Sequence, residues 1–328
     1  MGITPDYDMI IVGAGPAGMA SAIYGSRMGW KTLVIDKGAV GGLAAITPII
    51  ENYPGFSEIS GLEFAEKLRK QAEKFGAEVK DMVEVTDIKP NQFPIEVHTS
   101  SGIFTSKIVI LATGTNHRHL NVPGEEENEG KGVSYCATCD GPLYKGKKVA
   151  VVGGGNSAVT EALYLDNIIP GTTFGAGAAP VYLIHRRDQL RAEESLRNQI
   201  LKNSKVNFVW NTVVKEIHGS EAGVKKITLE DVNTGEVSSL RVKAVFIAIG
   251  IIPNNELAKK IGVELTEDGL IKVDKNQRTN IPRVYACGDI TPGQGQIAVA
   301  VGEGTTAAIS AFLDMRGGDW YGEETGDG

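Results

Sequence analysis

The sequence has few of the features that mark several large classes of protein. Only 6% of its 328 residues are aromatic, and only three are cysteines. Lys and Arg number 33 against 40 Asp and Glu, which gives a net charge of −7, and no basic cluster forms a face suited to a polyanion. The longest apolar runs, such as residues 244–252, fall far short of the roughly 20 residues needed to cross a bilayer. These absences argue against nucleic acid as a partner and against insertion into a membrane.

Recognisable targeting signals are missing as well, and this affects how the cysteines are interpreted. The first residues show no signal-peptide pattern, and Asp6 is incompatible with the myristoylation motif that Met1-Gly2 would begin, so we expect a cytoplasmic protein. In a reducing cytosol, the C-x-x-C motif of Cys136 and Cys139 indicates a redox pair or half of a metal site rather than a static disulfide. A structural zinc needs four ligands, and no second C-x-x-C or H-x-x-x-H completes a site, so we expect no metal.

A glycine-rich pattern near the N-terminus is typical of a dinucleotide-binding unit. Glycine makes up 41 of the 328 residues and is concentrated in discrete loops. An apolar run at 9–12 is followed by a glycine turn and a helix-forming segment at 19–28, and the next apolar run, 32–35, ends in Asp36. This order places a pyrophosphate at the helix N-terminus and a carboxylate against the ribose. The turn consists of Gly13, Ala14, Gly15, Pro16, Ala17 and Gly18.

The same arrangement recurs in the middle of the chain. The apolar run 148–152 leads into a second glycine turn, and a helix is expected at 157–167. Each copy also closes on a similar apolar strand, 108–112 in the first and 244–248 in the second. The first glycine of the turn and the glycine after the closing strand are 101 residues apart in one copy and 97 in the other. Two homologous nucleotide-binding domains are therefore predicted, as the length of the chain allows.

The order of these segments predicts how the two domains are connected. A further strand at 284–286 ends in Gly288-Asp289, where a carboxylate at the carboxyl edge of a parallel sheet can bind the polyol hydroxyls of a ligand. This strand most simply completes the first domain. We therefore predict an α/β protein with two Rossmann-like, three-layer ββα domains, the first made of residues 1–117 and 251–328 and the second, 118–250, inserted into it. The two crossings would form a double hinge.

The residue that follows the second strand of each copy distinguishes the two nucleotides. Asp36 in the first copy suits a free ribose hydroxyl. The corresponding strand of the second copy, 181–184, is followed by His185, Arg186, Arg187 and, one turn further on, Arg191. Arginines there can bind a ribose 2′-phosphate through paired hydrogen bonds, which predicts NADPH at the second site. The alternative interpretation is a solvated helix start that carries three arginines.

The C-x-x-C motif has the spacing of a redox-active dithiol. A two-residue spacing lets Cys136 and Cys139 close a tight disulfide, in which local dipoles stabilise one thiolate while the other resolves a mixed disulfide. Asp140 follows at once and either carries protons as thiolates form and leave or is a turn residue before Gly141-Pro142. Cys287 has no partner at a suitable spacing and is expected to be a small buried filler.

In their order along the chain, these motifs resemble the low-molecular-weight thioredoxin reductases of bacteria and archaea. The resemblance covers nearly the whole length and rests on residues 13–18, 51–55, 112–114, 136–141, 153–165, 185–192, 288–289 and 296–298. It implies an FAD site formed by Gly13, Ala14, Gly15, Pro16, Ala17, Gly18, Asp36, Lys37, Gly41, Gly42, Leu43, Asn52, Ala112, Thr113, Gly114, Gly288, Asp289, Gln296 and Ile297. It implies an NADPH site formed by Gly153, Gly155, Asn156, Ser157, Glu161, His185, Arg186, Arg187 and Arg191.

The resemblance also implies how the parts act. Cys139 would lie nearest the flavin, Cys136 would attack thioredoxin, and Asp140 would be the acid and base. Asn52 would face the flavin ring, and a helix beginning at Gln296-Ile297 would point its positive end at the pyrimidine end of the flavin, where it stabilises the anionic reduced form. The partner would be thioredoxin or a similar small dithiol protein. Such proteins are usually homodimers whose two domains rotate between two states.

Two positions depart from the pattern of this family. Family members commonly have Gln after Gly41-Gly42, whereas this chain has Leu43, which removes a hydrogen bond to the cofactor. The family's Gly-His-x-Pro-Asn becomes Gly-Ile-Ile-Pro-Asn at 250–254. Neither change touches the dithiol. A Gly- and Ala-rich insertion at 168–180 also lies close to the predicted arginine clamp in sequence, and it is either an inert excursion or a cover for the nucleotide site.

The predicted function is thioredoxin-disulfide reduction, in which electrons pass from NADPH through FAD and the Cys136/Cys139 dithiol to thioredoxin. Relatives that use reduced ferredoxin or a deazaflavin, or that act as dithiol oxidases, are the alternative, and they tend to lose the basic clamp that this sequence keeps. A flavoprotein that reduces ferredoxin or flavodoxin would lack the cysteine pair. A redox sensor without turnover would need an effector domain, and the sequence adds none.

Overall fold

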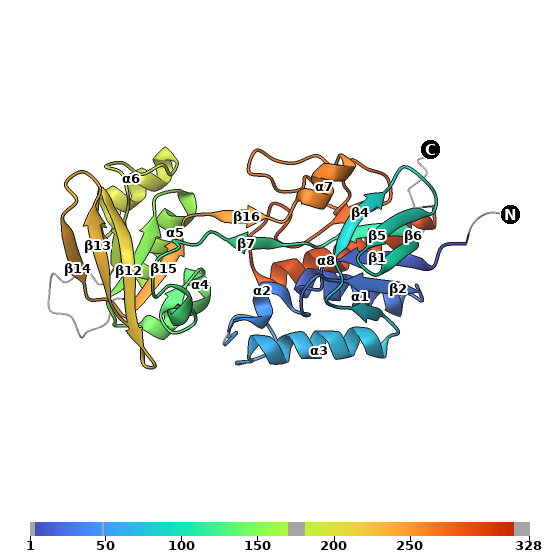
Figure 1. Cartoon of the computed structure of the whole chain (residues 1–328), viewed down its shortest axis with the longest axis horizontal. Helices are drawn as coiled ribbons and strands as arrows, with labels where there is room; N and C mark the ends of the chain where they lie inside the picture. Colours follow the sequence, from blue (N-terminus) through green and yellow to red (C-terminus); the bar gives the residue numbers. More distant parts are fainter. Residues whose placement is uncertain (1–3, 48, 170–180, 318–328) are drawn as a thin grey trace, which may run out of the picture. The chain divides into compact units, whose positions relative to one another are not determined.

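The computed structural model describes residues 4–47, 49–169 and 181–317. By internal packing the chain divides into two units, Met1–Asn116 with Pro253–Gly328, and His117–Ile252. The sequence analysis predicted that the chain passes from one domain to the other between residues 117 and 118 and again between 250 and 251. The segments that contain the crossings, β7 (Thr115–His117) and β16 (Ile251–Pro253), pair as a two-stranded sheet (Figure 1). The insertion at 168–180 lies almost entirely outside the described residues.

The first unit is built on one mixed sheet. Among the described residues it has seven strands, in the order β3 (Glu78–Lys80), β2 (Thr32–Ile35), β1 (Tyr7–Val12), β6 (Gly102–Leu111), β5 (Ile95–Thr99) and β4 (Val85–Lys89), with β17 (Val284–Ala286) also paired to β6. The pairs β1/β2, β1/β6, β2/β3 and β6/β17 are parallel, whereas β4, β5 and β6 run antiparallel. The pairing of β17 with β6 confirms that the strand at 284–286 completes the sheet begun at the N-terminus.

Alternation along β1 explains the layers of this unit. Met9 and Ile11 face a core shared with α1 (Pro16–Arg27), α3 (Gly61–Lys74) and α8 (Ile297–Met315), whereas Ile10 and Val12 face a second core. The second core includes side chains of β4, β5 and α7 (Glu256–Ile261). A short α2 (Gly42–Ala45) precedes α3. Because every residue of β2 is buried, the sheet is covered on both faces, as parallel strands require.

The second unit repeats this plan with a separate antiparallel sheet. Its parallel sheet has the order β11 (Asn207–Val209), β10 (Val181–Ile184), β9 (Val149–Gly153), β15 (Ala244–Ala248) and β8 (Val133–Ser134). Val149 and Val151 face α5 (Asn156–Ile168), whereas Ala150 and Val152 face the antiparallel sheet of β12 (Thr212–Ser220), β13 (Gly223–Asp231) and β14 (Val237–Leu240). The remaining elements are η1 (Glu126–Asn128), α4 (Ala137–Asp140), η2 (Gly141–Tyr144) and α6 (Glu194–Asn203). The predicted α/β class is confirmed.

Helix α8 is long and apolar enough, by length and composition, to pass for a membrane span. In the structure, however, α8 packs against the core of the first unit. Buried small residues along one face, among them Gly304, Ala307, Ala308 and Ala311, let it pack closely against α1. The contact is tightest where Gly304 meets the backbone of Ala17, and a Cβ placed on Gly304 would lie 2.0 Å from that carbonyl oxygen.

The close approach of α8 to α1 predicts opposite effects for two glycines of the same helix. Gly304→Ala must push the helices apart, and we expect the unfolding midpoint to fall by roughly 4–8 °C, which corresponds to about 2 kcal/mol of overpacking. Gly302→Ala is the matched control, because a Cβ on exposed Gly302 meets nothing within 4 Å. It should raise the midpoint slightly, since Ala favours a helix over Gly by about 0.5–1 kcal/mol. Thermal unfolding followed by circular dichroism checks both, and equal shifts would contradict the packing argument.

Candidate functional site

The redox-active turn of the second unit, residues 135–140, follows β8 and includes α4. Strand β8 pairs in parallel with β15, with Ser134 opposite Phe246, and delivers the chain to Cys136, which is the N-cap of α4. Cys136 and Cys139 form a disulfide with an S–S distance of 2.07 Å and a Cα–Cα distance of 5.3 Å. The structure therefore brings together the pair that the sequence predicted, and both side chains are partly exposed.

The hydrogen bonds of this turn distinguish the two sulfurs. Cys136 Sγ accepts the backbone N–H of Cys139 at 3.2 Å and lies 3.3 Å from Thr138 Oγ1. Donors aimed at a sulfur stabilise its thiolate and so favour attack by that sulfur. After reduction, the same two groups can stabilise a Cys136 thiolate. This local geometry favours Cys136 as the thiol that attacks an external disulfide.

Asp140 ends the same short helix and is partly buried. Burial raises the pKa of its carboxyl, and a hydrogen bond from Ser134 partly offsets the rise. The carboxyl therefore holds a proton to higher pH than an exposed aspartate does. A proton donor directly after Cys139 in the sequence suits the release of thiolates. Asp140 also raises the pKa of Tyr144, whose phenol is chiefly affected by burial.

The glycine turn of the first unit leaves room for a ligand above Gly15. A Cβ on Gly13 would lie 2.1 Å from the Ala112 carbonyl oxygen, and one on Gly18 would lie 1.9 Å from the Gly13 oxygen, whereas one on Gly15 meets nothing within 4 Å. Helix α1 begins at Pro16, and its N-cap, Gly15, provides no side chain to cap the first N–H groups. These N–H groups fit a pyrophosphate, which the helix dipole also favours.

Carboxylates lie beside this turn on two sides. Asp36 accepts the N–H of Ala14 at 2.6 Å with one oxygen and the N–H of Gly38 at 2.7 Å with the other. It fastens the turn to the end of β2 and keeps further lone pairs for ribose hydroxyls. Asp289 follows β17, and burial raises the pKa of its carboxyl. Hydroxyl groups of a bound polyol would donate hydrogen bonds to this carboxylate and so offset its loss of contact with water. Both carboxylates therefore fit the predicted FAD.

Glu303 of α8 supports the Asp289 turn and was missed by the sequence analysis. Its Oε2 accepts the Gly288 N–H at 2.8 Å and the Thr291 hydroxyl at 3.2 Å. Burial raises the pKa of Glu303, whereas these two hydrogen bonds lower it. No local motif marks such a residue, because it meets its partners only when α8 packs beside β17.

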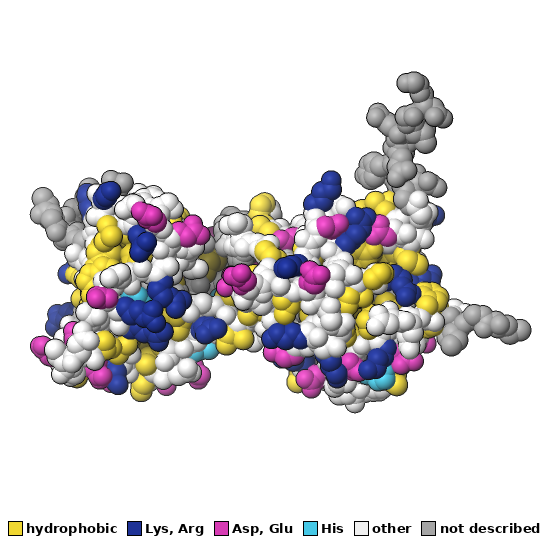
Figure 2. Space-filling view, turned by 90° about the horizontal axis from the view of Figure 1, so that it is seen from above, with side chains coloured by type: hydrophobic (Ala, Val, Ile, Leu, Met, Phe, Trp, Pro, Cys, Tyr) yellow, Lys and Arg dark blue, Asp and Glu magenta, His cyan; other side chains and the backbone are white. Residues whose placement is uncertain are grey.

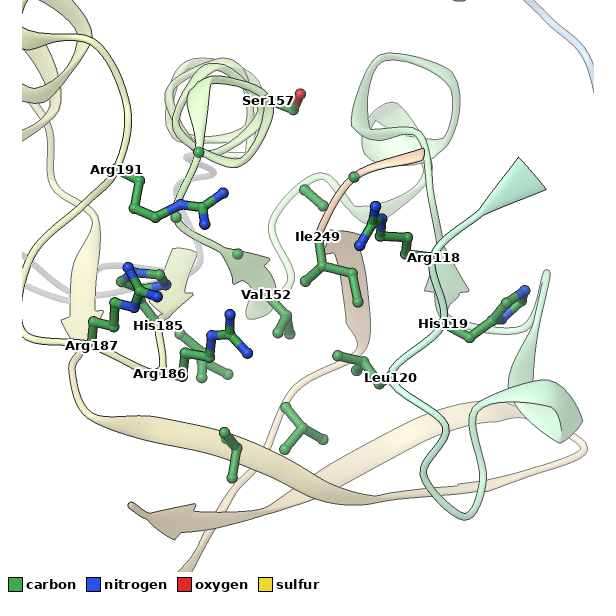
Figure 3. Close-up of a pocket in the computed structure, with 18 of the residues that line it drawn as sticks. Arg118, His119, Leu120, Val152, Ser157, His185, Arg186, Arg187, Arg191 and Ile249 are labelled. Atoms are coloured by element: carbon green, nitrogen blue, oxygen red, sulfur yellow. The ribbon is translucent and has the colours of Figure 1, made fainter. Parts of the chain in front are cut away.

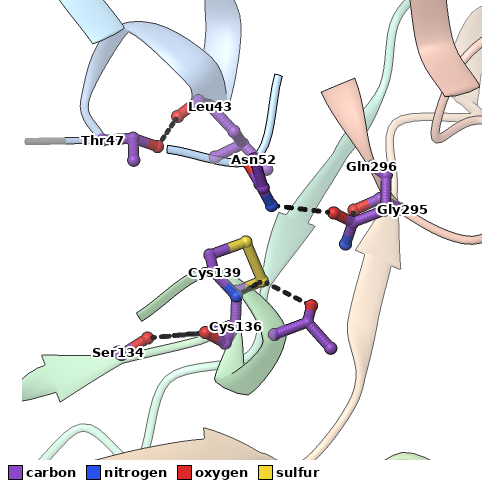
Figure 4. Close-up of a disulfide and its surroundings, with 9 residues drawn as sticks. Leu43, Thr47, Asn52, Ser134, Cys136, Cys139, Gly295 and Gln296 are labelled. Atoms are coloured by element: carbon purple, nitrogen blue, oxygen red, sulfur yellow. Dashed lines mark hydrogen bonds between the residues drawn. A yellow bond between two sulfur atoms is a disulfide. The ribbon is translucent and has the colours of Figure 1, made fainter. Parts of the chain in front are cut away.

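The other residues predicted for FAD lie in the same unit. Helix α8 begins at Ile297 with Gln296 as its N-cap, where the resemblance placed a helix start. Asn52 Nδ2 donates to Gln296 Oε1 at 3.2 Å (Figure 4). Thr113 Oγ1 donates to the Asn254 carbonyl at 2.7 Å just beyond β6. The remaining predicted residues follow β2, flank or begin α2, or follow β6: Lys37, Gly41, Gly42, Leu43, Ala112 and Gly114.

The second unit contains a cavity of about 660 Å³ at its glycine turn. Figure 2 shows Lys and Arg side chains gathered together on one face of this unit. In Figure 3, Arg186, Arg187 and Arg191 extend into the cavity from the segment after β10, and Arg118 extends from the opposite side. The sequence analysis did not predict Arg118. The predicted residues that line the cavity are Gly153, Gly155, Ser157, His185, Arg186, Arg187 and Arg191.

His185 lines this cavity and packs against its glycine turn. A Cβ on Gly154 would lie 2.2 Å from the His185 ring, so the ring packs directly on the glycine turn. It also meets Trp210 edge to face at 6.4 Å between centroids. Burial and then the nearby arginines lower the pKa of His185, against a hydrogen bond to the backbone of Gln189 that raises it. The segment that carries the arginines is a loop and not a helix start, since α6 begins only at Glu194.

Two predicted NADPH residues do not line the cavity. Asn156 accepts the Glu193 N–H at 2.8 Å and donates to Glu193 Oε1 at 3.1 Å, so it fastens α5 to the start of α6. Glu161 lies in α5, and its buried Oε2 has no hydrogen-bond partner within the described residues. Burial raises the pKa of this carboxyl to about 8. A direct role of either residue in nucleotide binding stays a prediction.

The buried carboxyl of Glu161 predicts a stability that depends on pH. An exposed glutamate has a pKa near 4.3, so between about pH 4.5 and pH 8 the unfolded chain ionises more readily than the folded one, and stability falls as pH rises. Glu161→Gln removes this loss. Without nucleotide, we expect the variant to be more stable than the wild type by about 1–3 kcal/mol at pH 8 and by much less at pH 5.

Differential scanning calorimetry at the two pH values measures the difference in unfolding midpoint. Glu221→Gln, which removes the same charge from an exposed turn, is the control. A midpoint difference between wild type and Glu161→Gln that is equal at both pH values would contradict the assignment.

The remaining predictions concern absences and the third cysteine. Cys287 is free and fully buried, as the sequence predicted. The part of the chain that the structure describes contains no group of three or more His, Cys, Asp or Glu side chains able to hold a metal ion.

Comparisons with known proteins give consistent findings. A family model described as pyridine nucleotide-disulphide oxidoreductase matches residues 7–304. The chain is 43% identical over 307 residues to the thioredoxin reductase of Bacillus subtilis, which covers 93% of each protein. It is similar to the solved structure of thioredoxin reductase from Streptococcus pyogenes, with 39% identity, a TM-score of 0.86 and coverage of 94% and 98% of the two chains. The thioredoxin reductase structure from Giardia duodenalis gives 32% identity, a TM-score of 0.87 and coverage of 94% and 99%.

Proposed function

Since this chain belongs to the pyridine nucleotide-disulphide oxidoreductase family, we propose that it is a thioredoxin reductase that uses NADPH and FAD. The observation that carries the proposal is the disulfide of Cys136 and Cys139, followed by the partly buried acid Asp140, in the same unit as an arginine-lined cavity at a glycine turn. A structural disulfide would need neither the acid nor the nucleotide cavity.

The donor is inferred from the charges in that cavity. Arg186, Arg187 and Arg191 converge on one side of it, and guanidinium groups bind phosphate through paired, charge-assisted hydrogen bonds. A ribose 2′-phosphate is the group that distinguishes NADPH from NADH. The glycine turn at the N-terminus of α5 suits the pyrophosphate of the same nucleotide. These features favour NADPH.

FAD is assigned to the first unit on the fit of its own residues. The open space above Gly15, the uncapped start of α1 and the carboxylates of Asp36 and Asp289 suit the pyrophosphate and hydroxyl groups of a dinucleotide. When bound, FAD takes two electrons from the reduced nicotinamide and supplies them to the disulfide. The N-terminus of α8, at Ile297, is a source of positive potential for an anionic ring.

Disulfide exchange then needs only residues of the redox-active turn. The Cys136 thiolate attacks one sulfur of the thioredoxin disulfide, forms a mixed disulfide and expels the other sulfur as a thiolate, which takes a proton from Asp140. Asp140, now ionised, takes the proton of Cys139, and the resulting thiolate attacks Cys136 Sγ. This step breaks the mixed disulfide, restores the Cys136–Cys139 bond and expels the second thioredoxin sulfur as a thiolate, which takes the proton from Asp140. The dithiol loses two electrons and two protons, and thioredoxin gains them. The cytoplasmic location and the homodimer stay predictions.

Steady-state turnover tests this proposal. We expect purified protein to consume NADPH only when oxidised thioredoxin is present, and to produce two thioredoxin thiols for each NADPH consumed. No consumption with either NADPH or NADH would refute a nicotinamide donor. Consumption that depends on oxygen rather than on thioredoxin would indicate an oxidase instead.

A further inference from the structure

Thr138 is an exposed residue in the middle of the redox-active turn. It lies between Cys136 and Cys139 in α4, and its Oγ1 is 3.3 Å from Cys136 Sγ. In the disulfide this sulfur carries no proton, so the Thr138 hydroxyl is the donor of the hydrogen bond. The sequence analysis assigned no role to Thr138.

The backbone holds the Cys136 sulfur within reach of this hydroxyl. Before the sulfur, Ser134 Oγ accepts the Cys136 N–H at 3.1 Å and lies 3.3 Å from the Cys136 carbonyl oxygen (Figure 4). After it, the same carbonyl accepts the N–H of Cys139 at 3.3 Å and the N–H of Asp140 at 3.1 Å. Threonine is branched at Cβ, which restricts χ1 and so limits where the hydroxyl can point.

The strength of this hydrogen bond depends on the charge of the sulfur. A neutral sulfur is a weak acceptor, whereas a thiolate accepts charge-assisted hydrogen bonds, which are about twice as strong as neutral ones. Two electrons and one proton convert the disulfide to a thiol at Cys139 and a thiolate at Cys136. The Thr138 hydroxyl therefore favours the reduced turn in which the negative charge lies on Cys136.

We propose that Thr138 is a further catalytic residue, whose hydroxyl stabilises the Cys136 thiolate that attacks thioredoxin. The inference rests on the proposed function, because it concerns the attacking thiol of that reaction. The thiolate forms a bond to one thioredoxin sulfur, and the other thioredoxin sulfur leaves as a thiolate. The Thr138 hydroxyl donates a hydrogen bond to the attacking sulfur and keeps its own proton. The backbone N–H of Cys139 donates to the same sulfur at 3.2 Å, but mutation of Thr138 removes only the contribution of the hydroxyl.

Alkylation of Cys136 by iodoacetamide measures this thiolate without nicotinamide or thioredoxin. Cys139→Ser is the background for every variant, since it removes the second thiol of the turn and keeps the backbone N–H at residue 139. Cys287 is fully buried, so Cys136 is the thiol that reacts. Thr138→Val has the shape of Thr without its hydroxyl, and Thr138→Ser keeps the hydroxyl. Both changes fall on an exposed position, and flavin content and circular dichroism check that the variants are folded.

The profile of alkylation rate against pH gives the expected result. We expect Thr138→Val to shift its midpoint upward by about one pH unit. A thiolate that is harder to form is also more nucleophilic, by a factor of about three for this shift. The variant should therefore react about threefold slower than the background on the acid side of the midpoint and about threefold faster on the alkaline plateau, so the two profiles cross. Thr138→Ser should follow the background within about twofold at each pH.

Other titratable groups near the turn are the same in the proteins compared. Helices η2 and α5 pack against α4. Among the described residues of the turn, η2 and α5, the other titratable side chains are Tyr135, Asp140, Tyr144, Glu161, Tyr164 and Asp166. All of them are present in both Thr138→Val and Thr138→Ser. A difference between these two variants therefore reports the hydroxyl.

Two outcomes would overturn the inference. One is a Thr138→Val profile that coincides with that of Thr138→Ser. The other is a rate that falls by the same factor at every pH, because the hydroxyl would then affect access to the sulfur and not the stability of its thiolate. Since the assay uses neither the electron donor nor the partner, a failure of the proposed function is distinguished from a failure of the role assigned to Thr138.

Discussion

Cys139→Ser is expected to abolish thioredoxin reduction while leaving the reduction of the flavin by NADPH intact. The remaining Cys136 can attack a disulfide, but nothing on the turn can then resolve the mixed disulfide, so turnover stops at the covalent adduct. The cavity that is proposed to hold NADPH does not include Cys139. Anaerobic stopped-flow absorbance measures flavin reduction, and steady-state assays measure thioredoxin turnover, which should fall by at least about 1000-fold.

The third cysteine provides the matched control. Cys287 is fully buried, and burial raises the pKa of its thiol to about 12, so it is neither accessible nor ionised. Cys287→Ser should leave thioredoxin turnover within about twofold of the wild type. Turnover that survives in Cys139→Ser would show that electrons reach thioredoxin by another route.

Arg186→Ala combined with Arg187→Ala is expected to weaken the binding of NADPH far more than the binding of NADH. Each arginine can make charge-assisted hydrogen bonds to a 2′-phosphate, each worth about 1.5–3 kcal/mol. Losing both should raise the KM for NADPH by at least about 100-fold, since 1.4 kcal/mol corresponds to a factor of ten. The KM for NADH should change by less than about fivefold, because NADH has no 2′-phosphate for these side chains to bind.

A second double variant separates this local effect from a change in overall charge. Arg241 and Lys243 are exposed and do not line the cavity, so replacing both by Ala removes the same charge from elsewhere in the unit. It should leave both KM values near those of the wild type. Equal losses for NADPH and NADH in the Arg186 and Arg187 variant would show that these arginines bind a group common to both nucleotides.

Apolar runs that end at a polar residue or a glycine made much of the fold predictable. The runs 32–35, 181–184, 244–248 and 284–286 were predicted as strands, and they coincide with β2, β10, β15 and β17. A parallel strand buried on both faces is nearly all apolar, and a polar residue or a glycine follows each of these runs within two residues, so the end of each strand is visible in the sequence. The start of α8 at Ile297 was predicted only through the family resemblance.

The supporting residues of the site could not be predicted in this way. Glu303 contacts the Asp289 turn only because α8 packs beside β17, and Arg118 contributes to the cavity only because its segment lies across from the arginine loop. Ser134 is next but one to Cys136 in sequence, but its hydrogen bonds with the backbone N–H and carbonyl of Cys136 form only because the chain turns between β8 and α4. Asn156 is the opposite case. It lies inside a predicted nucleotide-binding motif, but its side chain hydrogen-bonds Glu193 at the start of α6.

Anaerobic titration of the purified yellow protein with NADPH, followed by flavin absorbance, tests the proposed electron route most directly. The wild type should take up two equivalents before excess NADPH accumulates, because the flavin and the Cys136–Cys139 disulfide each accept two electrons. Cys139→Ser should take up one. A titration with NADH alone should require far higher concentrations. Flavin that is not bleached by NADPH, or a wild type that accepts only one equivalent, would contradict the route from NADPH through FAD to the dithiol.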